Sequence, residues 1–234
     1  YTVYKGNTTM TFRAWNESTN RPTYPVEVRV WDNGWSLLET YTVDPAQTDY
    51  EDGVPIGLES NTTAAGHYKS WRKLNYDYQG RLESVDQYYD ISASKKLTTT
   101  YGYDEFGRRW MTESPDGTIR LTVRDRLDRV TEEWVGKDAT DSEWDDPAGT
   151  SPNNMVQVSA TFYDESTAGN GTSGVGDGLI TSRQNYSAAE TYYQTRYKYD
   201  WRNRLVQSRA PGKLTVKRTL DNLGRPTQVE TYVD

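Results

Sequence analysis

Tyr76-Asp77-Tyr78-Gln79-Gly80-Arg81 and Tyr103-Asp104-Glu105-Phe106-Gly107-Arg108 are two copies of one motif, Tyr-Asp-x-x-Gly-Arg. Looser copies begin at positions 124, 199 and 220, and another keeps only Tyr163-Asp164 before a Gly-rich insert. A recurring motif is typical of an array of one structural unit, which argues against a unique active site. The residues expected to build the repeat are Tyr76, Asp77, Gly80, Arg81, Tyr103, Asp104, Gly107, Arg108, Asp125, Arg129, Tyr163, Asp164, Tyr199, Asp200, Arg204, Asp221, Gly224 and Arg225.

The spacing of the motif predicts how its strands are connected. The aspartates recur at positions 77, 104, 125, 164, 200 and 221, so the shortest interval is 21 residues. At ~3.3 Å per residue this length supplies two strands and two turns. A parallel strand-helix-strand unit needs roughly 30 residues. The sequence therefore predicts an all-β, antiparallel repeat array with little or no helix.

The motif itself has the composition of a turn. Asp can accept a hydrogen bond from the backbone two residues on, and Gly adopts a positive φ without steric cost. Other copies replace Gly with Asn203 or Asp128, which tolerate the left-handed region best among the other residues. We therefore expect φ > 0 at this position. The following Arg should begin the return strand and form a bidentate pair with a motif Asp, in the same or the next repeat.

Alternating apolar residues support strands on both sides of these turns. Ile119, Leu121 and Val123 alternate with polar residues, and so do the apolar residues of 156–162. Tyr163 breaks that alternation, which predicts a bulge or a change of face there. Pro115-Asp116-Gly117 and Pro211-Gly212 are expected to form the hairpin turns at the opposite ends of the strands.

Composition limits the class of protein. Only 34% of residues are hydrophobic and the mean hydropathy is −0.94, but 19 Tyr and 8 Trp argue against disorder and favour a thin β-structure. The net charge of −7 disfavours a nucleic-acid partner. No stretch approaches the roughly 20 apolar residues of a membrane span. Since there are no cysteines, stability must come from the strand ladder and side-chain packing.

Two segments are expected along the chain. Residues 1–66 match the repeat least and are interpreted as degenerate repeats or an N-terminal β cap, with an Asn33-Gly34 hairpin turn between Trp31 and Trp35. Residues 67–234 form the repeat array, with inserts at 137–154 and 166–178. The start without Met favours a piece of a longer protein.

Few residues suggest chemistry. The single histidine, His67, lacks the partners of a triad or a zinc site, and the Gly-rich insert lacks a phosphate-binding Lys. We expect no catalytic residue, metal or cofactor. The 137–154 insert is acidic, which predicts a solvated loop or, alternatively, a calcium site. Aromatic side chains that a sugar ring can stack on are the remaining candidates: Trp110, Trp134, Trp144 and Trp201.

The repeated Tyr-Asp and Gly-Arg pairs resemble the YD-repeat, or RHS-repeat, family of large secreted or cell-surface proteins. This resemblance implies a curved or spiralling β-sheet that forms part of a shell around a toxin, or a barrel as in the teneurins. It also implies a partner in the remainder of the parent chain, and possible contact with an enclosed toxin or a surface glycan. Self-cleavage in the family uses Asp-Pro-x-Gly sequences, and this chain has only an isolated Asp146-Pro147-Ala148-Gly149, so proteolysis is not carried over.

The favoured function is therefore a non-enzymatic structural segment, for encapsulation or surface interaction. A carbohydrate-binding or adhesion module that uses exposed Tyr and Trp is the alternative. A glycosidase, which needs two carboxylates around one bond, is a more distant one.

Overall fold

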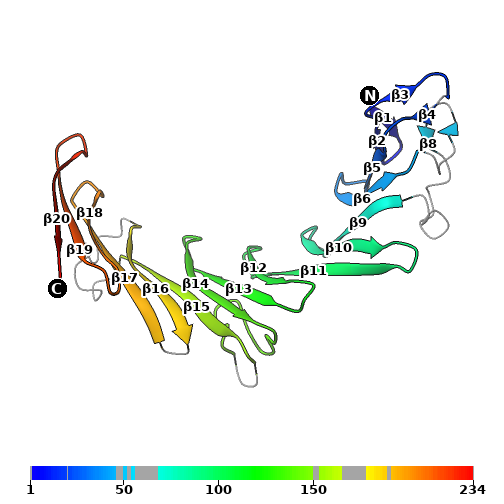
Figure 1. The fold of residues 1–234 in the computed structure, drawn as a ribbon. Helices are drawn as coiled ribbons and strands as arrows, with labels where there is room; N and C mark the ends of the chain where they lie inside the picture. The colour runs from blue at the N-terminus through cyan, green and yellow to red at the C-terminus, as the bar shows by residue number, and fades with distance from the viewer. Residues whose placement is uncertain are drawn as a thin grey trace. The chain divides into compact units, whose positions relative to one another are not determined.

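The computed structural model describes residues 2–19, 21–45, 50–51, 54–55, 68–149, 153–164, 178–188 and 191–233. Every regular element among these residues is a β-strand (Figure 1), so the expectation of an antiparallel, all-β fold is confirmed. The chain divides into two compact units. The first comprises Tyr1–Gly102 with Glu113–Asp116, and the second comprises Tyr103–Thr112 with Gly117–Asp234.

The first unit is an antiparallel sheet with two small ribbons. In sheet order its strands are β1 (Thr2–Lys5), β2 (Thr8–Thr11), β5 (Val26–Trp31), β6 (Leu37–Val43), β9 (Tyr68–Tyr76), β10 (Leu82–Asp90) and β11 (Lys95–Tyr103). The ribbons pair β3 (Trp15–Asn16) with β4 (Arg21–Pro22), and β7 (Tyr50–Glu51) with β8 (Val54–Pro55).

Alternate residues of these strands build the core of the first unit. Val26 and Val28 are fully buried, and Phe12 is 2% exposed beneath Trp15 of the β3–β4 ribbon. Trp71 stacks on Tyr88 with ring centroids 4.0 Å apart. The ribbon therefore covers one face of the sheet, and large aromatic side chains fill the space between them.

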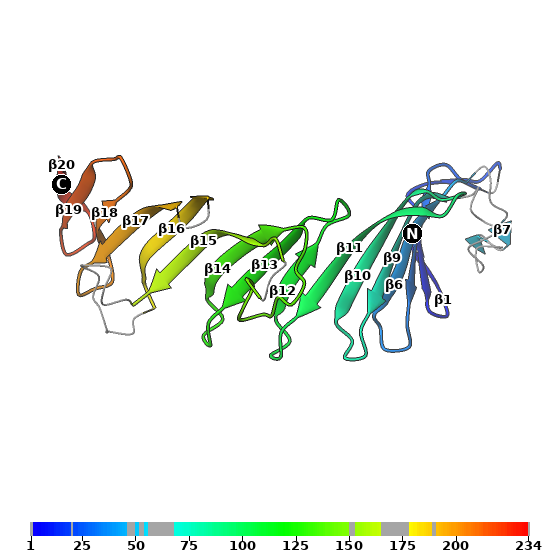
Figure 2. The same cartoon turned by 90° about the horizontal axis from the view of Figure 1, so that it is seen from below.

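The second unit continues the same pattern of sequential antiparallel strands, seen side by side in Figure 2. In order they are β12 (Arg109–Glu113), β13 (Ile119–Arg124), β14 (Val130–Gly136), β15 (Val156–Tyr163), β16 (Ile180–Ala188), β17 (Thr191–Tyr199), β18 (Leu205–Arg209), β19 (Thr215–Leu220) and β20 (Pro226–Tyr232). Every residue of β20 is exposed. The sheet is thus open at this edge, as expected.

The insert between β14 and β15 contributes side chains to a hydrophobic cluster of the second unit. Its Ala139 and the adjoining Met155 pack on a cluster that contains Ile119 and Leu121, and Leu121 is only 1% exposed. The acidic side chains of this insert point outward: Asp141, Glu143, Asp145 and Asp146 are exposed. The prediction of a charged, solvated loop therefore holds for its outer side, while its inner side supplies core.

Register shifts change which residues are buried. The predicted bulge at Tyr163 is confirmed by a shift between Phe162 and Tyr163. A second shift, in the β14–β15 pairing, leaves Val156 and Val158 49% and 37% exposed while Ser159 is buried. The strand was predicted correctly, but its alternating apolar residues do not all face a core.

Some predictions fall outside the described residues. The boundary expected between residues 66 and 67 lies there, together with His67 and nearly all of the 166–178 insert. The division into a cap and a repeat array therefore stays a prediction.

Candidate functional site

The motif builds a hydrogen-bonded turn around its aspartate, as the copy at Asp104 illustrates. One carboxylate oxygen, Oδ1, accepts hydrogen bonds from the amides of Phe106 (3.0 Å) and Arg108 (2.8 Å). The Asp104 amide donates to the Arg108 carbonyl, and the Gly107 amide donates to the Asp104 carbonyl. Gly107 has φ 78°, so the predicted left-handed position is confirmed. The short side chain thus satisfies the backbone donors that the turn would leave unpaired.

The other copies repeat this geometry. Asp128 and Asn203 take the place of Gly with φ of 65° and 61°. The carboxylates that accept two turn amides in the same way are Asp77, Asp125, Asp200 and Asp221. Asp164 retains one contact of this kind: its Oδ1 accepts a hydrogen bond from the amide of Gly178, which follows the Gly-rich insert in the sequence.

The motif arginine links its own turn to the next one. Its Nε donates to Oδ2 of the motif Asp at 2.7–2.8 Å in the copies ending at Arg81, Arg108, Arg129, Arg204 and Arg225. Its Nη1 extends further. Arg108 reaches the Asp125 carbonyl at 2.8 Å, and Arg204 reaches the Asp221 carbonyl at 2.6 Å. The predicted Arg–Asp pair within a repeat is confirmed, although the Arg Nε contacts one carboxylate oxygen, Oδ2, rather than both. Between repeats the acceptor is a backbone carbonyl at Asp125 and Asp221, and a carboxylate at Asp164, where Arg129 Nη1 donates to Oδ2 at 3.1 Å.

The motif tyrosine makes a link in the opposite direction. Tyr163 donates its hydroxyl to the carbonyl of Val130, which follows the preceding Asp125–Arg129 turn, at 3.1 Å. The Arg129 guanidinium lies over the Tyr163 ring at 4.3 Å. Tyr76 likewise donates to the Leu37 carbonyl at 2.9 Å. Tyr and Arg thus join successive turns in the second unit, and Tyr76 makes such a link in the first.

These contacts lower the pKa of four motif carboxyl groups, those of Asp77, Asp125, Asp200 and Asp221. Partial burial raises the pKa of Asp125, but hydrogen bonds from Arg129 and the Leu127 amide outweigh it. The pKa of Asp200 is lowered chiefly by the hydrogen bond from the Arg204 guanidinium. Ionised, hydrogen-bonded carboxylates of this kind suit a structural role better than proton transfer.

A further turn of the same type was not recognised in the sequence. Asp32 accepts hydrogen bonds at Oδ1 from the amides of Gly34 (2.8 Å) and Ser36 (2.7 Å). Trp35 occupies the left-handed position with φ 66°. The prediction of a two-residue Asn33-Gly34 turn was therefore wrong, because Asp32 organises a longer one. The Asp at the end of a strand four residues before Ser36 was the available signal.

Large side chains project from the tips of these turns. The five complete motif copies each carry one exposed apolar or aromatic residue between the Asp and the left-handed position. These residues are Tyr78, Phe106, Leu127, Trp201 and Leu223. Tyr78 is 93% exposed, and Trp35, at the left-handed position of its own turn, is 82% exposed. The motif edge is therefore rich in accessible rings.

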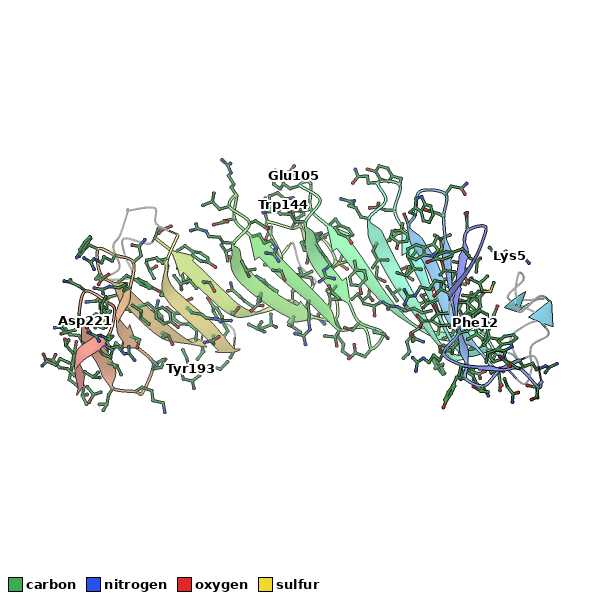
Figure 3. The ribbon with its side chains drawn as sticks, turned by 90° about the horizontal axis from the view of Figure 1, so that it is seen from above. Lys5, Phe12, Glu105, Trp144, Tyr193 and Asp221 are labelled. Carbon is green, nitrogen blue, oxygen red and sulfur yellow. The ribbon has the colours of Figure 1, made fainter. Side chains whose placement is uncertain are left out.

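The structure separates the four tryptophans proposed for ligand stacking. Trp110 and Trp134 are half-buried against the Ile119–Leu121 cluster, and the Trp134 indole donates to Glu132. Trp144 contacts Phe106 edge-to-face, with centroids 5.7 Å apart, and lies near Glu105 in Figure 3. Trp201 is 80% exposed beside Arg202. They do not form one shared binding surface.

Other kinds of site are lacking in the described part of the chain. It contains no group of three or more His, Cys, Asp or Glu side chains that could hold a metal ion, and the acidic insert is no exception. None of its residues belongs to a helix suited to crossing a bilayer.

No protein-family model and no curated protein matches this chain. Solved structures with a related course of the chain include "Crystal Structure of TcdB2-TccC3-Cdc42" (TM-score 0.45, 12% identity, 98% of this chain). They also include TcdB2-TccC3 without its hypervariable C-terminal region (0.44, 14%, 95%) and the Photorhabdus luminescens Tc holotoxin pore with the TccC3 mutation D651A (0.27, 11%, 96%). The chain spans 12%, 11% and 13% of the lengths of these three chains.

Proposed function

We propose that this chain is a non-enzymatic structural segment of a large secreted or cell-surface YD-repeat protein, where it forms part of a β-sheet shell or stalk. The observation that carries the proposal is the motif turn with its two-way links. Arg108, Arg129 and Arg204 each hold the Asp of their own turn and also reach the next one. Links between nearest neighbours let a sheet grow by addition of identical units, which is how repeat proteins gain length.

The engagement of the motif carboxylates supports a role without catalysis. Asp104, Asp125 and Asp221 accept hydrogen bonds from their own turn amides and from their own arginines. A general acid or base needs a carboxyl group directed at a substrate. The residues that recur most regularly in the chain are thus committed to holding the backbone.

Truncation tests the proposal. Removing β19 and β20 by ending the chain at Arg209 should leave the remaining strands folded, with lower stability, because repeat arrays lose stability by increments. Circular dichroism and urea unfolding measure this. Complete unfolding of the truncated chain would contradict an array. In the source cells, an antibody against the segment should label the surface or the medium, and exclusively internal labelling would contradict the location.

A carbohydrate-binding or adhesion role is the second candidate, and Trp35 is the observation that favours it. A bulky residue with positive φ is an outlier, and such strain is concentrated at functional sites. Its ring is also 82% exposed, so packing does not account for the residue. Exposed aromatic faces are surfaces on which sugar rings stack, and Tyr78 lies on the tip of a neighbouring motif turn in the same unit.

A glycan array separates this candidate from the first. Binding that is lost in Trp35→Asn and kept in Trp201→Ala would assign it to the first unit. Asn is the matched replacement because it tolerates the left-handed conformation. An array without hits on folded protein would remove this candidate and leave the structural role intact.

A further inference from the structure

A basic pocket lies beside the hairpin that joins β18 to β19 in the second unit. Its volume is about 560 Å³, and its side-chain walls include Gln194, Arg196, Arg209, Lys213, Leu214 and Val233. Three of these residues are cationic, and none of the described residues that line the pocket is acidic. Leu214 is 49% exposed and Val233 is 80% exposed, so they add an accessible apolar wall.

The strand register concentrates positive charge on this face. Arg196 in β17 lies directly opposite Arg209 in β18. Gln207, two residues before Arg209, lies between Lys198 and Lys217 of the neighbouring strands. Because side chains two residues apart share a face, these cations project from the same side of the sheet. Like charges directly opposite one another destabilise a sheet, and a bound anion would relieve that cost.

The charge of the surrounding segment contrasts with that of the whole chain. Residues 191–233 contain nine Lys and Arg but three Asp and Glu, whereas the chain carries a net charge of −7. Two of the three carboxylates, Asp200 and Asp221, are held by motif arginines, and Glu230 accepts a hydrogen bond from Gln228. Glu230 lies directly opposite Lys217 in the β19–β20 pairing and offsets that charge. The segment still has six more cationic than acidic residues (nine minus three), so the local potential is positive and attracts anions to the pocket.

The Arg196 side chain is held in place for recognition. Its Nε donates to Gln194 Oε1 at 2.9 Å, and the Gln194 amide donates to the hydroxyl of fully buried Ser182 at 3.3 Å. This relay restrains the guanidinium through its Nε and uses neither η nitrogen. A planar guanidinium matches carboxylate, sulfate and phosphate groups through paired hydrogen bonds.

We propose that this pocket binds a small ligand that carries sulfate or phosphate groups. Arg196, Arg209 and Lys213 supply the counter-charges, and Leu214 with Val233 contacts the part of the ligand that bears the anionic group. The site is independent of the structural role proposed above, since it rests on the pocket and the register of β17 to β19.

Thermal unfolding of the whole chain tests the proposal. Inorganic pyrophosphate or a sulfated disaccharide should raise the midpoint of unfolding above the value in sodium chloride at equal ionic strength, because a ligand that binds only the folded state stabilises it. The probe that gives the larger rise distinguishes a free anion from a sulfated sugar. Arg196→Gln should weaken the apparent affinity by roughly tenfold, since it removes a charge-assisted contact.

Two variants keep the test decisive. Lys213→Gln changes only an exposed hairpin residue, so it should weaken binding even where Arg196→Gln folds poorly. Arg218→Gln removes the same charge from the opposite face of β19 and should bind as the wild type does. The proposal is overturned if neither probe exceeds chloride, if both pocket variants bind normally, or if Arg218→Gln binds as weakly as they do.

Discussion

Replacing Asp104 perturbs the motif turn most strongly, because its side chain is only 3% exposed. Asp104→Ala removes the acceptor for two turn amides and the ion-pair partner of Arg108. A hydrogen bond to a charged group contributes about 1.5–3 kcal/mol, and breaking a buried ion pair costs about 3–5 kcal/mol. Since one carboxylate makes all these contacts, the losses do not add. We expect the free energy of unfolding to fall by about 3–4 kcal/mol.

A graded series identifies the cause of that loss. Asp104→Asn keeps an oxygen for the two amides but turns an NH2 group toward Arg108, so it should cost about half as much as alanine. Glu105→Ala alters the exposed tip of the same turn and should stay within about 0.5 kcal/mol of the wild type. Urea unfolding followed by tryptophan fluorescence measures all three variants. The reasoning is refuted if Asp104→Ala is as stable as Glu105→Ala, or if Asn and Ala cost the same.

Three further predictions concern protonation and backbone conformation. The pKa of Asp125 is lowered from 3.8 in the folded state, so its contribution is present above pH 3.8 and is lost as the pH falls through the lowered pKa; an acid titration of the urea midpoint should decline there, and a flat profile would count against the carboxylate contacts. Burial and the charge of Glu39 raise the pKa of Tyr68 to about 12, so stability should fall as the pH rises from 10 toward 12; Tyr68→Phe should reduce this dependence, and the remainder belongs to Tyr76 and Tyr186, whose pKa values are also raised. Gly107→Ala should lower stability by about 1–2 kcal/mol and Gly107→Asn by less, because φ is 78° while no atom lies within 4 Å of the added Cβ; equal stability of Gly and Ala would show that the turn had relaxed.

The motif turn could be predicted from the sequence because its stabilising contacts join residues that are close together in the chain. Asp77 to Arg81 contains its own acceptor, its left-handed glycine and its ion-pair partner within five residues. The sequence alone was therefore sufficient to predict the turn. The reach of Arg108 to Asp125 depends on which strands are neighbours, so the sequence left same-repeat and next-repeat pairing open.

Two errors have identifiable physical causes. Trp35 stands where the motif has Gly, and propensity strongly disfavours such a residue at positive φ, so the Asp32 turn was mistaken for an Asn-Gly hairpin. In β15 the apolar residues alternate along the sequence, but a register shift changes which of them are buried, and Val156 is left exposed. The first error concerns a local turn whose Asp32 was the signal, whereas the second depends on the pairing with β14, which a pattern of residue types does not specify.

Hydrogen exchange in the Arg108→Ala variant tests most directly whether the motif couples neighbouring turns. The turn amides of Leu127, Asp128 and Arg129 all bond to Asp125, whose carbonyl also accepts from Arg108. We predict roughly tenfold faster exchange in both turns, 104–108 and 125–129, because local opening of one weakens the other. Arg225→Ala is the matched control, since that side chain is 72% exposed and no described turn follows it. Faster exchange confined to residues 104–108 would contradict coupling between repeats.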